Sequence, residues 1–62
     1  MKRKELKNLA KKIAKYEQII QTSDDPKLIR EAQAAIIEIS GMVDSLDDIT
    51  LIDEYVQDIL AG

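Results

Sequence analysis

The sequence predicts an all-α protein, a small three-helix bundle built from a long antiparallel helical hairpin and a shorter third helix. The chain is rich in Ala, Leu, Ile, Lys, Glu and Gln and has only two glycines and one proline, a composition that favours helices. Apolar residues recur every three or four positions in three stretches, which is the helical period. Two short clusters of turn residues separate these stretches, and we expect one helical domain over residues 1–62.

The first helix is expected from about residue 3 to residue 22. Its apolar residues form a heptad-like seam with apolar neighbours on either side: Leu6, Leu9, Ile13, Tyr16 and Ile20 in the seam, Ala10 and Ile19 beside it. In the turn that follows, Asp25 is suited to cap the next helix, and Pro26 is suited to its first position. A link this short predicts that the first two helices are antiparallel.

The second helix is expected to be the centre of the bundle, from about residue 26 to residue 46. It has one apolar seam and a second seam beside it: Leu28, Ala32, Ala35, Ile39, Met42 and Leu46, then Ile29, Ile36 and Val43. A helix with two adjacent seams packs between two neighbours. The pattern therefore predicts that the other two helices lie on either side of the second.

The end of the second helix is open to more than one interpretation. Gly41 is suited to end it near residue 41 with a glycine cap, and Ser45 with Asp48 then forms a capping box for the third helix. Thr50 with Asp53 offers a similar start slightly later. The apolar spacing, however, stays in phase through Gly41, and this favours a continuous helix to residue 46.

The third helix is then expected from about residue 49 to residue 61. Five apolar residues form its buried side: Ile52, Val56 and Ile59 inward, with Ile49 and Leu60 beside them. A chain of this length buries only about 60% of its unfolded surface, so its core is thin. The absence of Cys and His excludes disulfides and removes the usual zinc ligands. Stability must therefore come from helix packing or self-association.

The sequence also predicts the compartment. No apolar run approaches the length of a membrane span, and the lysine-rich start is not followed by the hydrophobic block of a signal peptide. We therefore expect a cytoplasmic protein that does not associate with membranes.

Charge is distributed unevenly along the chain, although the net charge is only −3. Residues 1–22 include seven basic and two acidic residues, whereas residues 42–62 include six acidic residues and no basic one. On a helical wheel, two stripes of charge fall opposite the apolar seams of the first and third helices: Lys4, Lys7, Lys11 and Lys15, then Asp47, Glu54 and Asp58. Such stripes most simply keep a small protein soluble. Because both point away from the shared core, they are also suited to pair between copies or with a partner of opposite charge.

The lysine stripe is a candidate anion-binding site. Lysines contact phosphates without reading base sequence. Tyr16 could stack on a base, but it is better explained as a core residue, because it lies in the apolar seam. The acidic last third opposes a long polyanion, whereas a small signalling nucleotide held between subunits is less affected by this repulsion. A small protein that sequesters such a nucleotide would fit a role in phage–host conflict.

No residues predict catalysis, a cofactor or a metal site. There is no Cys or His for a nucleophile–base pair, and a thin bundle offers no deep pocket. The acidic run from Asp44 to Asp48 has neither the glycine nor the terminal glutamate of a calcium-binding EF-hand loop. Capping and the helix dipole explain Asp47 and Asp48 more simply. We therefore expect a protein that is not an enzyme.

The back of the second helix is its most informative surface. Ala34, Ile37 and Gly41 fall opposite its core side, where a monomer would carry polar residues. The small residues let another backbone approach closely, and Ile37 supplies an apolar knob between them. The simpler interpretation is that Gly41 ends the helix and that Ile37 is a tolerated surface residue. Leu51 and Tyr55 in the third helix either extend this patch or form a second one.

These features predict a small non-enzymatic helical protein that self-associates, as a homo-oligomer, and acts by binding or sequestering a partner. The alternative is a binder of phosphate-bearing ligands, either nucleic acid or a small signalling nucleotide, through the lysine stripe. A third hypothesis is a structural or regulatory subunit whose apolar face is completed by a larger protein.

Overall fold

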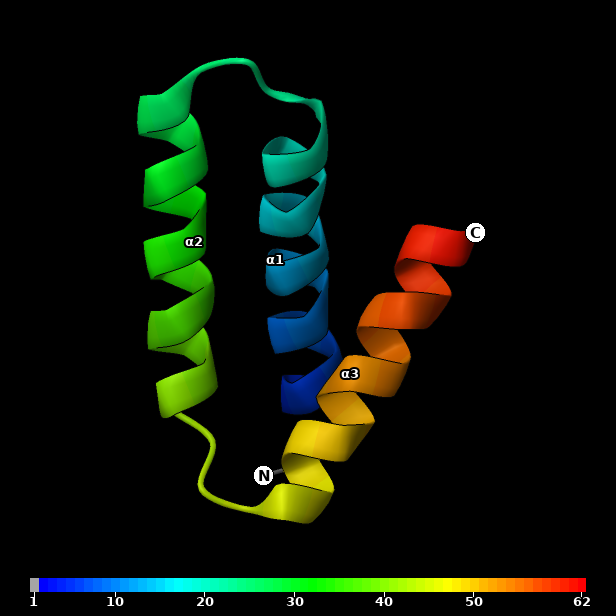
Figure 1. Ribbon diagram of the computed structural model, residues 1–62. Helices are drawn as coiled ribbons and strands as arrows, with labels where there is room; N and C mark the ends of the chain where they lie inside the picture. Colours follow the sequence, from blue (N-terminus) through cyan, green and yellow to red (C-terminus); the bar gives the residue numbers. More distant parts are fainter. Residues whose placement is uncertain (1) are drawn as a thin grey trace.

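The computed structural model describes residues 2–62, and within this range it contains three α-helices joined by two short links (Figure 1). Helix α1 spans Arg3–Thr22, α2 spans Pro26–Gly41 and α3 spans Leu46–Ala61. The all-α three-helix fold is therefore as predicted, and α1 has the expected bounds. Helices α2 and α3 have 16 residues each, so the third helix is shorter than the first but not than the second.

The turn between α1 and α2 is formed by short-range hydrogen bonds. The carboxylate of Asp25 accepts a hydrogen bond from the backbone N–H of Lys27, with 3.0 Å between the two heavy atoms, and Pro26 occupies the start of the helix. The hydroxyl of Ser23 accepts a hydrogen bond from the backbone N–H of Asp25 at 3.1 Å. The predicted cap is confirmed, and α1 and α2 run antiparallel (Figure 1).

The central helix is α1, and the prediction that the second helix is central is wrong. Helix α1 packs against both α2 and α3, whereas α2 and α3 barely touch each other (Figure 1). The wide buried arc of α1 explains this arrangement, because Ala10 and Ala14 are almost completely buried beside Leu6 and Ile13. On the helical wheel the two alanines lie toward Lys7, which reaches Tyr55 of α3. Small side chains here let α3 approach α1 closely.

Helix α2 ends at Gly41, so the preference for a continuous helix to residue 46 is also wrong. The backbone N–H of Met42 bonds to the carbonyl of Ile39 at 3.1 Å, and that of Val43 bonds to the carbonyl of Ser40 at 3.3 Å. These bonds span three residues and tighten the last turn. The φ of Gly41 is not positive, so the helix ends without a left-handed glycine cap.

Helix α3 begins three residues earlier than expected. Ser45 occupies its N-cap position, although its hydroxyl makes no capping hydrogen bond within residues 2–62, and Asp47 and Asp48 stand in its first turn. Their negative charges interact favourably with the positive end of the helix dipole. Thr50 lies inside the helix, where its hydroxyl donates to the carbonyl of Leu46 at 2.9 Å. The later start at Thr50 is therefore wrong.

Several residues that the sequence places in the core lie at the surface instead. Leu46 is 80% exposed, Met42 58% and Leu28 46%, whereas Val43 stays buried although it lies beyond the helix. Ile59 of α3, which the sequence places inward, is 38% exposed. The heptad pattern thus overestimates the burial of α2 near its end, because the chain must leave the helix to carry α3 to the far side of α1.

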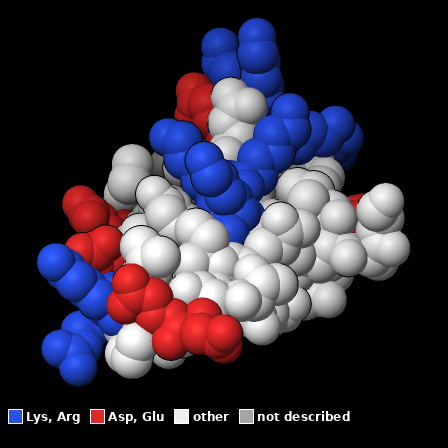
Figure 2. Space-filling view, turned by 90° about the horizontal axis from the view of Figure 1, so that it is seen from above, with Lys and Arg blue, Asp and Glu red and all other residues white. Residues whose placement is uncertain are grey.

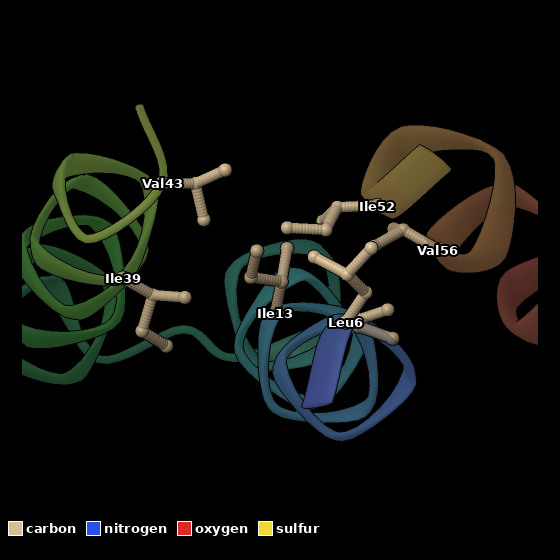
Figure 3. Close-up of a cluster of buried hydrophobic side chains, with 8 residues drawn as sticks. Leu6, Ile13, Ile39, Val43, Ile52 and Val56 are labelled. Carbon is tan, nitrogen blue, oxygen red and sulfur yellow. The ribbon is translucent and has the colours of Figure 1, made fainter. Parts of the chain in front are cut away.

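The core consists of apolar residues from all three helices and from the link after α2 (Figure 3): Leu6, Ala10, Ile13, Ala14, Ile39, Val43, Ile52 and Val56. The predicted inward positions of Ile52 and Val56 are confirmed. The extents of the molecule are 34 × 25 × 15 Å, so the helices form an open layer rather than a closed triangle. An open layer leaves apolar side chains accessible between α2 and α3.

Candidate functional site

The outer face of α2 carries the first candidate surface, which we name the α2 ridge (Ala34, Ile37 and Gly41). All three residues are exposed, and Ile37 is 73% exposed. A Cβ added to Gly41 would meet no other part of the described chain within 4 Å. The expected exposure of these three residues is therefore confirmed.

Leu51 and Tyr55 do not extend the α2 ridge, so that alternative is wrong. Helix α3 lies on the opposite side of α1 from α2 (Figure 1), and both residues are half-buried against the core. The ammonium of Lys7 stands 5.6 Å from the centre of the Tyr55 ring, within range of a cation–π interaction. These two residues mainly pack α3 onto α1.

A second surface, which the sequence interpretation missed, lies between α2 and α3. We name it the α2–α3 groove, a hollow of about 150 Å³ whose floor is α1 and whose walls are the other two helices. Figure 3 shows Val43 and Ile52 pointing toward each other from the two sides, above Ile13. The groove is lined by Ile13 and Glu17, by Ile36, Ser40 and Val43, and by Ile49, Ile52, Asp53, Val56 and Gln57.

The signal for this groove was present in the sequence as the second seam of α2. Ile36 and Val43 belong to that seam, and both line the groove. The sequence interpretation assigned the seam to a contact with a neighbouring helix, but α2 and α3 barely touch, and Ile36 stays only half-buried. The polar lining is also informative, because Glu17 and Asp53 are acidic and none of the described lining residues is basic.

The lysine stripe lies on the solvent-exposed surface of α1 and reaches α3 at Lys7 and Lys11. Lys4, Lys7, Lys11 and Lys15 are all exposed, and Figure 2 shows basic side chains gathered along one edge of the molecule. A hollow of about 300 Å³ beside it is lined by Lys7, Lys11, Tyr55, Asp58 and Ile59. Asp58 belongs to the acidic stripe of α3, so at this point the two stripes lie side by side within one chain.

The acidic residues do not gather into a metal site in the part of the chain that the structure describes, where no three His, Cys, Asp or Glu side chains are grouped to hold an ion. Across residues 2–62, no helix combines the length and apolarity that crossing a bilayer requires.

The chain matches no protein-family model, and comparisons with curated proteins and with solved structures find no significant match. Its class is that of small all-α helical bundles. Such a fold hosts many functions and does not by itself assign one.

Proposed function

We propose that this is a non-enzymatic helical protein that self-associates and acts by binding or sequestering a partner. The observation that carries the proposal is the exposure of Ile37, 73%, between the small exposed residues Ala34 and Gly41. A single exposed apolar side chain is common on protein surfaces. Here it stands in line with two small residues on the face of α2 that points away from α1, where a second helix can approach closely.

The properties of Gly41 add support. A glycine at a position where alanine fits without strain typically costs about 0.4–1 kcal/mol of stability, and here the backbone does not need glycine, because the φ of Gly41 is not positive. The space around it is also open within the described chain. Close approach by another backbone is a reason for glycine at this position that the single chain does not supply.

The energetic case rests on the thin core. The buried apolar cluster contains eight residues, two of which are alanines, and small domains of this kind frequently gain stability by oligomerisation. Burying one Ile side chain contributes about 1.5–3 kcal/mol. Covering Ile37 is therefore a substantial gain for a chain of 62 residues.

Light scattering coupled to size exclusion tests the proposal across a range of protein concentrations. We expect the measured molar mass of the wild type to exceed the chain mass of 7.0 kDa and to rise with concentration. The Ile37→Glu variant should keep the mass of one chain at every concentration. Leu46→Glu is the matched control, because it introduces the same charge at another exposed aliphatic residue; it should behave as the wild type. A wild type that remains at 7.0 kDa at every concentration rejects self-association.

The proposed mode of action is occupancy of a partner in the cytoplasm. A larger protein that bound the α2 ridge would compete with self-association for Ile37. The Ile37→Glu substitution should then weaken both contacts.

The second candidate function is binding of phosphate-bearing ligands. It is favoured by the four exposed lysines of the lysine stripe and by the hollow beside Lys7 and Lys11. It is opposed by Asp58 in the same hollow and by the position of Lys7 over the Tyr55 ring. The self-association proposal therefore ranks first.

Fluorescence anisotropy with labelled DNA, RNA and cyclic nucleotides at two salt concentrations tests this alternative. Polymer binding should weaken steeply with salt, because it releases counterions. Lys11→Gln with Lys15→Gln should reduce binding, and Lys27→Gln, an exposed lysine on α2, should not. Absence of binding at low salt removes the hypothesis.

A further inference from the structure

We infer that the α2–α3 groove receives the α2 ridge of a second copy of this chain. The inference rests on the proposed self-association and specifies its two surfaces. It follows from three properties of the described residues, which are the shape of the groove, the shape of the ridge and the charges on each.

The groove has the form of a site for a fourth helix. Its floor and walls come from three different helices, so a helix laid between α2 and α3 would contact all three. Ile13 at the floor is already buried, whereas Ile36 is half-buried and Ile49 is 38% exposed. An inserted helix would therefore complete the burial of Ile36 and Ile49 on the two walls of the groove.

The ridge has the complementary form. Arg30, Ala34, Ile37 and Gly41 follow one another at intervals of four, three and four residues, so they form one line on the helix. The eleven helical steps from Arg30 to Gly41 span about 16.5 Å. Because Ala34 and Gly41 are small, the helix axis can approach the floor of a groove closely. Ile37, which lies between them, can then pack between the walls of the groove.

The charges of the two surfaces also match. The ionisable residues among those lining the groove are the acids Glu17 and Asp53, and the ionisable residue in line with the ridge is the base Arg30. Arginine pairs with carboxylates through two parallel hydrogen bonds when the geometry allows it. A contact of ridge with ridge would place two arginine-bearing faces together and would leave the groove uncovered.

A contact between two different surfaces of the same chain is head-to-tail. It forms a ring when the rotation between copies closes and an open filament when it does not. Each copy then contributes α2 twice, once as a wall of its own groove and once as the helix inserted into the groove of its neighbour.

Mixing two variants tests this arrangement directly. Ile37→Glu damages the ridge, and the double variant Glu17→Lys with Asp53→Lys damages the groove. Each should be monomeric alone, and an equimolar mixture should form a one-to-one dimer, because one intact ridge meets one intact groove. Glu54→Lys is the control: it makes the same change beside Asp53, at an exposed position that does not line the groove, and it should assemble as the wild type.

The outcomes separate this inference from the proposed function. A wild type that is monomeric throughout rejects both. A wild type that assembles, together with a groove variant that assembles equally well or a mixture that stays monomeric, leaves self-association intact and overturns the ridge-in-groove contact.

A second groove variant guards against loss of folding in the first. Ser40→Arg places a bulky basic side chain on the wall of the groove at an exposed position. The Ser40→Arg variant should be helical by circular dichroism and monomeric alone. Mixing it with Ile37→Glu should restore dimer formation. Failure of this rescue in a folded variant contradicts the inference.

Discussion

Replacement of Gly41 by alanine separates the stability of one chain from its assembly, because the two should change in opposite directions. Gly41 is the last residue of α2, and its φ is not positive. Apart from the chain neighbours and the nearby helix backbone, an added Cβ meets no described atom within 4 Å. Alanine therefore fits the monomer without strain. A partner helix that packs closely on the α2 ridge, however, would meet the new methyl group.

The expected magnitudes follow from these observations. Alanine lowers the conformational entropy of the unfolded chain, so the free energy of unfolding of the monomer should rise by about 0.5–1 kcal/mol. For a domain of this size, each kcal/mol corresponds to about 4–8 °C in the melting temperature. Overpacking of a tight helix contact costs about 1–3 kcal/mol, which is at least a roughly fivefold rise in the dissociation constant.

Two measurements on the same Gly41→Ala protein check the prediction. Urea unfolding followed by circular dichroism, at a concentration where light scattering finds only monomer, reports the stability of the chain. Sedimentation over a wide range of concentrations reports assembly. A less stable monomer refutes the structural reasoning about the end of α2, and unchanged assembly refutes a close contact at Gly41.

Three further substitutions test the fold. Asp25→Ala should lower the free energy of unfolding by about 1 kcal/mol in urea denaturation, because it removes the cap on the N–H of Lys27, and Asp24→Ala should not. Leu46→Lys should change stability by less than about 0.5 kcal/mol, since Leu46 is 80% exposed; a loss of about 2–5 kcal/mol would instead indicate a core position. Ala10→Leu should lower the thermal midpoint, at a cost of about 1–3 kcal/mol, because Ala10 has no exposed surface.

Local features of the sequence were sufficient to predict most of the helical structure. The bounds of α1 and the start of α2 follow from apolar spacing and from the turn at Asp25 and Pro26. These signals act over a few residues, so they are readable without knowing the fold. The inward positions of Ile52 and Val56 follow from the same spacing.

The order of the helices in space was not predictable in the same way. The two seams of α2 suggested that α2 packs between two neighbouring helices. Instead α1 occupies the central position, because Ala10 and Ala14 let α3 pack closely against it. A small buried residue gives no hydrophobic signal that distinguishes it from an exposed alanine. The route of the chain after Gly41 depends on which helix is central. With α1 at the centre the chain leaves α2 at Gly41, and this is why the heptad pattern failed at Met42 and Leu46.

Of the two candidate surfaces, one was predictable from local sequence features and the other was not. The α2 ridge was predictable, because residues opposite an apolar seam are exposed in any packing of that helix. The groove was not, because it exists only where α2 and α3 both pack on α1 and leave a gap between them. Its acids, Glu17 and Asp53, lie 36 positions apart in the sequence, and only the fold brings them to one hollow.

The placement of α1 at the centre has a consequence for α2 that strengthens the case for assembly. Within one chain α2 has a single packing neighbour, yet it carries apolar residues toward α1, toward the groove and on the ridge. A helix at the edge of a layer needs only the first of these. If the groove and the ridge cover each other between copies, the apolar residues on both surfaces gain a common explanation, and α2 regains the two-sided burial that its sequence pattern indicates.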